Sequence, residues 1–160
     1  MSNKNEEPVT EITKVKFSPD MCQVEYTLDA FPFTASGETD ELTNEFIDSM
    51  CALPEHAIAI KELPKGADKP YRCNALSLSH RQSDQGINRK AVISCTKVTA
   101  TGKADNISTP QVLYQAANTD ADVVPEKAAF AIKEVVRQAK LFILGNRRLK
   151  KIYCQLELAA

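Results

Sequence analysis

The sequence predicts an α+β fold, a mostly antiparallel sheet with two main helices packed on one face. Segments with the two-residue period of strands lie in two groups, near the start of the chain and in its middle. Each group precedes a segment with the 3.6-residue period of an amphipathic helix. Strands and helices grouped in the order β-β-β-α-β-β-α favour an antiparallel sheet with its helices gathered on one side.

The first strands are predicted on either side of a turn at Ser18-Pro19-Asp20, over residues 12–17 and 22–28. In the second segment, apolar residues at positions 22, 24, 26 and 28 alternate with polar ones, which is typical of a half-buried strand. Residues 31–34 are predicted as a short third strand at the edge of the sheet, because Pro32 cannot donate a backbone hydrogen bond.

The first helix is predicted to begin at Thr39 or Asp40, either of which suits an N-cap, and to end at Pro54. Its apolar stripe contains Leu42, Phe46, Met50 and Leu53. Residues 55–63 are apolar and favour a second, shorter helix. A second hairpin is then expected over residues 71–80 and 91–100, with residues 82–89 as an exposed connection, followed by a short extended segment at 106–110.

The clearest element is a helix between Pro125 and Gly145, since proline suits the first turn of a helix and glycine the position after its end. Its apolar residues fall on one face at the helical period: Ala128, Ile132, Val135, Val136, Ala139, Phe142 and Ile143. Lys133, Arg137 and Lys140 share a flank of this helix, within an arc of about 60°.

Length and composition predict one domain. Hydrophobic and charged residues make up 43% and 26% of the 160 residues, as in an ordinary globular protein. We expect a single domain over residues 10–152, a flexible tail at 1–9, and a C-terminal tail or edge strand at 153–160. The start MSNKNEEPVT has neither the basic nor the apolar region of a signal peptide, which predicts a cytoplasmic protein.

The sequence contains no recognisable catalytic, metal or cofactor motif. Its five cysteines and two histidines lack the spacing of a zinc site or a disulfide framework, and its five glycines are isolated rather than gathered in a phosphate-binding loop. Ser79 and His80 are neighbours in a predicted strand, so their side chains should point to opposite faces. We therefore expect no cofactor, no metal and no enzymatic activity.

Charge is distributed unevenly along the chain. Residues 1–50 carry eleven acidic and three basic side chains, whereas residues 127–151 carry eight basic side chains and one acidic one. The basic end indicates either a surface for a polyanion or a partner for the acidic end of the same fold. The candidate polyanion-binding residues are Lys133, Arg137, Lys140, Arg147, Arg148, Lys150 and Lys151.

The C-terminal residues Gln155-Leu156-Glu157-Leu158 allow two interpretations. The alternation of apolar and polar residues from Ile152 to Leu158 is typical of an amphipathic strand. Gln155, Leu156 and Leu158 also resemble the Q-L-x-L-F peptide by which bacterial replication and repair proteins bind the sliding clamp. Ala159 stands where that peptide has its aromatic residue, and loss of this anchor would weaken binding by about 1–3 kcal/mol.

Three stretches carry a resemblance over most of the chain: ITKVKF…CQVEYTL, AVISCTKVTATGKADNISTP and AKLFILGNRRLKKIYCQLELAA. Together they resemble a group of small proteins from tailed bacteriophages and prophages, in which a β-hairpin start and a long helix precede a basic stretch and a Q-L-x-L tail. This sequence differs in having Cys95 where glycine is usual and Ala159-Ala160 where an aromatic residue is common. The resemblance implies a phage source and carries no activity with it.

These observations lead to one main hypothesis, a non-enzymatic phage accessory binding protein acting in DNA metabolism or takeover of host replication. Its expected partners are nucleic acid at the basic end and the host sliding clamp, or another host protein, at the tail. The alternative is an anti-defence protein that inhibits a host immune enzyme or sequesters its nucleotide signal. A small enzyme is the third candidate. No membrane partner is expected, and a homo-oligomer is left open.

Overall fold

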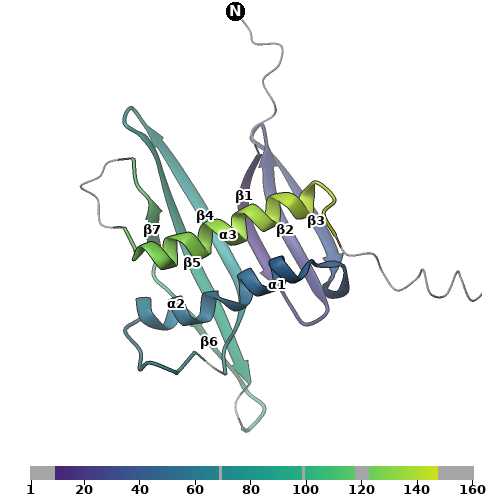
Figure 1. Ribbon diagram of the computed structural model, residues 1–160, viewed down its shortest axis with the longest axis vertical. Coiled ribbons are helices and arrows are strands. Elements are labelled where there is room, and N and C mark those ends of the chain that lie inside the picture. The colour runs from purple at the N-terminus through teal and green to yellow at the C-terminus, as the bar shows by residue number, and fades with distance from the viewer. Residues whose placement is uncertain (1–9, 69, 99, 118–122, 148–160) are drawn as a thin grey trace, which may run out of the picture.

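The computed structural model describes residues 10–68, 70–98, 100–117 and 123–147. They form a seven-stranded sheet in the order β3-β2-β1-β4-β5-β6, with β7 paired to β5 beside β6. Every strand pair is antiparallel. The helices cover one face of this sheet (Figure 1). The predicted α+β class, with a mostly antiparallel sheet, is therefore confirmed.

The elements have the following bounds. The first half contains β1 (Thr10–Phe17), β2 (Met21–Leu28), β3 (Phe31–Glu38), a 3-10 turn (Thr39–Glu41), α1 (Asn44–Cys51) and α2 (Leu53–Ile60). The second half contains β4 (Arg72–Ser83), β5 (Gly86–Val98), β6 (Ala104–Ser108), β7 (Val112–Gln115) and α3 (Glu126–Ile143).

The first helical segment differs from the prediction at both ends. Thr39 opens a 3-10 turn, and the helix begins after Thr43, whose hydroxyl accepts a hydrogen bond from the Phe46 amide at 3.2 Å. Pro54 does not end the helical segment but lies in the first turn of α2, where proline costs no hydrogen bond. Ala52 joins α1 to α2 in a helical conformation, so the two short helices form one bent arm.

The β4–β5 hairpin is longer than predicted. Its pairs continue without interruption from Ser77↔Val92 to Ser83↔Gly86, so the prediction of an exposed connection at residues 82–89 is wrong. Polar side chains occupy both faces of this projecting end, and the alternation that marks a half-buried strand is therefore absent from the sequence. The prediction also lacked β7, a strand of four residues directly after Pro110 and Gln111.

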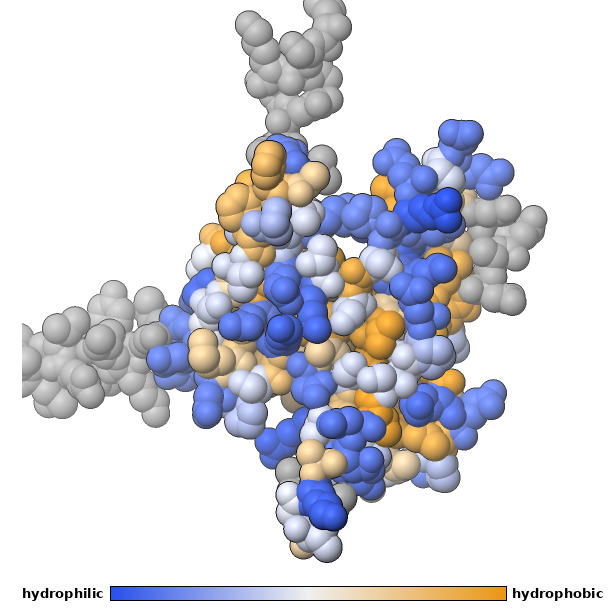
Figure 2. All heavy atoms as spheres, turned by 180° about the vertical axis from the view of Figure 1, so that it is seen from behind, coloured by the Kyte–Doolittle hydropathy of each residue, from blue (hydrophilic) through white to orange (hydrophobic). Residues whose placement is uncertain are grey.

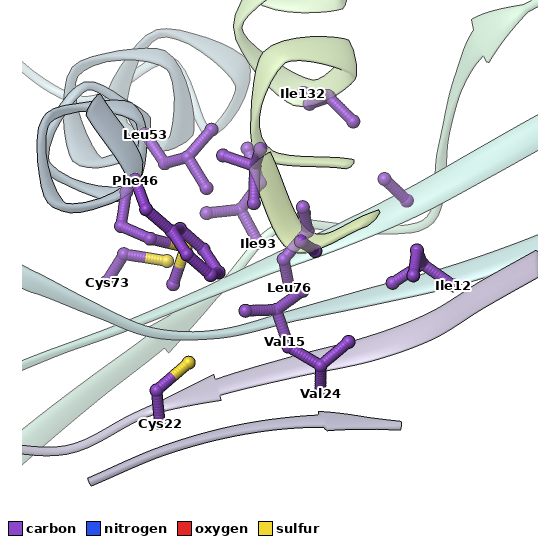
Figure 3. Close-up of a cluster of buried hydrophobic side chains, with 14 of the residues drawn as sticks. Ile12, Val15, Cys22, Val24, Phe46, Leu53, Cys73, Leu76, Ile93 and Ile132 are labelled. Carbon is purple, nitrogen blue, oxygen red and sulfur yellow. The ribbon is translucent and has the colours of Figure 1, made fainter. Parts of the chain in front are cut away.

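The core lies between α3 and the central strands. Val15, Leu76 and Ile93 are side by side on β1, β4 and β5, are fully buried, and face Ile132 of α3 (Figure 3). Phe142, near the end of α3, packs edge-on against Phe46 of α1, with ring centroids 5.8 Å apart. The predicted apolar stripe of α3 is thus the main cover of the sheet.

Register shifts in β1 and β4 change which residues face this core. One lies between Ile12 and Lys14, and the other between Cys73 and Ala75. Because each strand gains one residue there, Ile12 is buried together with Val15 although they are three residues apart. Between these shifts β1 pairs with β4 only over residues 14–16 and 75–77, and the strands diverge towards the start of β1 (Figure 1).

Replacing Ile132 by Asp should unfold the protein or make it insoluble, because the carboxylate would be buried without a partner in the hydrophobic core. Circular dichroism and thermal melting measure this. Phe130→Asp is the matched control, since Phe130 lies on the same helix with 69% of its surface exposed. A soluble Ile132→Asp variant that melts like the wild type would contradict the packing of α3.

Candidate functional site: a cleft lined by cations

A cleft of about 290 Å³ opens where β1 and β4 diverge, and α3 forms one of its walls. The lining residues come from five elements that are far apart in the sequence: Glu11, Ile12, Leu78, Arg89, Tyr114, Gln115, Lys133, Val136 and Lys140. Three of these side chains are cationic and one is anionic. We refer to this site as the cation cleft.

The helical wall of the cation cleft is formed by Lys133, Val136 and Lys140. Their spacing of three and four residues places them on one flank of α3, next to the stripe that contains buried Ile132 and Ala139. Within the part of the chain that the structure describes, neither lysine forms an ion pair. Both lysines are exposed residues and can therefore contact a ligand.

The opposite wall contains an ion pair between β1 and β5. Arg89 donates two hydrogen bonds to Glu11, from Nη1 to Oε2 at 2.6 Å and from Nη2 to Oε1 at 3.0 Å. The two side chains are only 24% and 17% exposed. The pair therefore joins the diverging strands across β4 with the paired geometry that guanidinium and carboxylate groups favour.

The surroundings keep the Glu11 carboxylate ionised. Hydrogen bonding to Arg89 lowers the pKa of Glu11 below its ordinary value, although partial burial acts in the opposite direction. The positive charges of Arg89 and Lys140 lower this pKa further. Glu11 thus offsets one of the three cations and leaves the cleft with a positive balance.

Tyr114 supplies a neutral hydroxyl beside the ion pair. It is 5% exposed, and this burial raises the pKa of its phenol, while the neighbouring Arg89 charge opposes the shift. The phenol is therefore protonated at neutral pH. Together with the amide of Gln115, it adds hydrogen-bonding capacity to a site whose remaining lining is apolar.

The structure separates the predicted basic residues into different environments. Lys133 and Lys140 line the cation cleft. Arg137 lies on the outward face of α3 and donates hydrogen bonds to Glu134 at 2.7 and 3.1 Å. Arg147 stacks on the Phe142 ring, 3.9 Å from its centroid, and donates to the Ser36 carbonyl at 3.0 Å. Arg147 thus joins the end of α3 to β3.

The other predicted binding residues lie outside the described residues. These are Arg148, Lys150 and Lys151 of the basic run and Gln155, Leu156 and Leu158 of the tail.

Sequence reasoning missed Glu11, Arg89 and Tyr114. Arg89 lies two residues before buried Ala91, and positions 89, 91, 93 and 95 all face the helices. Extending the predicted strand towards its start would have revealed this alignment. Glu11 gave no such signal, because only the fold brings it to a residue 78 positions away.

The described part of the chain contains no group of three or more histidine, cysteine or acidic side chains arranged to hold a metal ion. Its four cysteines, Cys22, Cys51, Cys73 and Cys95, are free thiols. No helix there is long and apolar enough to cross a membrane.

No family model, curated protein or solved structure matches this chain. The fold and the site by themselves define an α+β protein with a cation cleft beside its longest helix.

Replacing Glu11 by Gln should lower the free energy of unfolding by about 1–2 kcal/mol at pH 7, because Arg89 would lose a partly buried ionic partner. The folded-state pKa of Glu11 is depressed, so its stabilisation is present above the unfolded pKa of about 4.3 and is lost as the pH falls. The difference between wild type and variant should therefore shrink below about pH 4. Urea unfolding of both proteins at pH 7 and below about pH 4 measures this difference in the free energy of unfolding.

Glu25→Gln is the control for this experiment, since Glu25 pairs with Lys16 at 3.8 Å on the surface and should contribute little. An equal effect of the two substitutions at pH 7 would contradict a special role for the Glu11–Arg89 pair.

Proposed function

We propose that this is a non-enzymatic binding protein that holds the phosphates of a nucleic acid in the cation cleft. The observation that carries the proposal is the alignment of Lys133 and Lys140 on one flank of α3, opposite Arg89. Three cations against one carboxylate favour an anionic ligand, and phosphate groups bind lysine and arginine through charge-assisted hydrogen bonds.

The two walls of the cleft suit different parts of this task. The lysines are exposed and mobile point charges, which neutralise a phosphate without demanding one geometry. Arg89 is held in place by Glu11, so its guanidinium is already oriented before a ligand arrives. Sequence-independent binding of this kind depends on phosphate contacts and falls steeply with salt.

The biological setting belongs to the same proposal. Resemblance to tailed-phage proteins favours a role in DNA metabolism or in takeover of host replication, in the cytoplasm of a bacterial host cell. The sliding clamp of the host remains the proposed partner of the Q-L-x-L tail at Gln155, Leu156 and Leu158. These two contacts are separate proposals, because none of the described residues that line the cation cleft belongs to the tail.

A second candidate is an anti-defence protein that sequesters a nucleotide signal. The size of the cation cleft favours it, because about 290 Å³ is close to the volume of sites that hold small ligands. A mononucleotide or cyclic dinucleotide would then bind through the same lysines. Competition between such nucleotides and an oligonucleotide separates the two candidates.

Reversing both lysines, in Lys133→Glu with Lys140→Glu, should weaken oligonucleotide binding at least tenfold. It should also reduce the slope of log K against log salt by about one to two units, as expected for the loss of two phosphate contacts. Fluorescence anisotropy at several salt concentrations gives both quantities. Lys127→Glu with Arg137→Glu is the matched control, because it makes the same charge change on α3 outside the cleft.

Equal losses of oligonucleotide affinity in the two double variants would show that net charge, rather than the cleft, governs binding. No retention of single- or double-stranded DNA by the wild type at low salt would end the nucleic-acid proposal, and tight nucleotide binding would then favour the second candidate.

The tail proposal has its own test. If the tail is a docking peptide, removing residues 153–160 should abolish binding to the sliding clamp and leave the melting temperature unchanged. If the tail is a paired strand, the same deletion should lower the melting temperature by several degrees. Ala159→Phe should tighten clamp binding by restoring the aromatic anchor. A large drop in melting temperature after truncation would contradict docking.

A further inference from the structure

An exposed group of aromatic rings lies at the free end of the β2–β3 hairpin. Phe31 and Phe33 on β3 have 70% and 48% of their surface exposed. The Tyr26 ring on β2 stacks on Phe33, with centroids 5.8 Å apart and an angle of 24° between the ring planes. Figure 2 shows an apolar patch at this end of the molecule. We call Tyr26, Phe31 and Phe33 the hairpin aromatic surface.

The rings are exposed because α3 does not extend over them. Alternation along the strands places Tyr26 and Phe33 on the same face as Val24 and Ala35, which the helices cover. Phe142, near the end of α3, packs against Gly37 at the opposite end of β3. Rings of this size usually gain stability from burial, so their exposure indicates a contact surface.

The hairpin aromatic surface lies close to the cation cleft across neighbouring strands. Ile12 lines the cleft and is the cross-strand neighbour of Tyr26, which in turn is the neighbour of Phe33. Two strand spacings of about 4.8 Å separate Ile12 from Phe33, or roughly 10 Å. A strand with the ~3.4 Å rise of B-form DNA covers that distance in about three nucleotides, and a more extended single strand covers it in fewer.

We infer that the hairpin aromatic surface stacks the bases of a single-stranded nucleic acid whose phosphates occupy the cation cleft. This inference rests on the proposed function and specifies its ligand. Positive charge along the backbone and aromatic rings beneath the bases are the two features that bind single strands with little sequence preference. In a duplex the bases are already stacked on one another, so the rings have no free base to contact.

The test uses the full chain and three fluorescent ligands of about 15 nucleotides: a single strand, a duplex, and a strand of abasic sugar-phosphates. The wild type should bind the single strand more tightly than the other two. Phe31→Ala with Phe33→Ala should weaken single-strand binding about 10- to 100-fold. It should leave the salt slope and the affinity for the abasic strand unchanged, because no phosphate contact is lost.

Two further variants test whether the effect is specific to aromatic rings on the hairpin. Phe33→Tyr keeps an aromatic ring and should retain single-strand affinity. Phe130→Ala removes an equally exposed ring on the outward face of α3 and should change nothing. Phe31 is largely exposed, but Phe33 is about half exposed and stacks on Tyr26, so the double variant should stay folded and melt only a few degrees below the wild type.

The outcomes separate the inference from the proposal beneath it. If the double phenylalanine variant binds the single strand like the wild type while the lysine variant does not, stacking is refuted and phosphate binding stands; the rings then serve another partner, such as a protein. Equal wild-type affinity for the single and abasic strands would also refute stacking. If reversing Lys133 and Lys140 leaves binding unchanged, the proposed function fails and the inference fails with it.

Discussion

The burial of one face of α3 is the interaction on which the rest of the structure depends. This helix lies across the sheet from β7 towards β3 (Figure 1) and packs on β1, β7, α1 and α2. The side chains of Ile132 and Val135, on the inner face of this helix, are fully buried. The same packing fixes the rotation of the helix about its axis, and this rotation places Lys133 and Lys140 at the cation cleft. Stability and candidate function therefore share one helix, with the buried stripe beside the charged flank.

The cation cleft exists because two strands stop pairing. The register shift at Ile12/Lys14 in β1 lies beside the cleft, where β1 and β4 stop pairing, whereas the shift at Cys73/Ala75 in β4 lies at the other end of their three residue pairs. The strands then lack backbone hydrogen bonds to each other in this region, and the Glu11–Arg89 pair spans the opening instead. A partly buried ion pair adds little net stability when compared with apolar packing. Its value here is to hold a charged opening in a defined shape.

The β3 edge combines exposed aromatic rings with protection against pairing to another strand. Pro32 offers no N–H, the Ser36 carbonyl accepts a hydrogen bond from Arg147, and the Glu38 amide donates to the Glu41 carboxylate at 2.7 Å. Three positions of this edge are thus blocked or occupied by groups of the same chain. The hairpin can present its rings while its backbone remains a poor template for a second strand, which suits a ligand that contacts side chains.

The sequence by itself determined the fold class, α3 and the first hairpin, because each depends on a local period and on local end signals. Pro125 lies one residue before the observed start of α3 and Gly145 two residues after its end, and alternation from Cys22 to Val24 marked the buried part of β2. Tertiary structure alone decided the site. Arg137 belongs to the same flank as Lys133 and Lys140 by periodicity, yet its neighbour Glu134 holds it on the outward face. Glu11 and Arg89 meet across the opening where β1 and β4 stop pairing, and no period in the sequence records a contact between residues that distant.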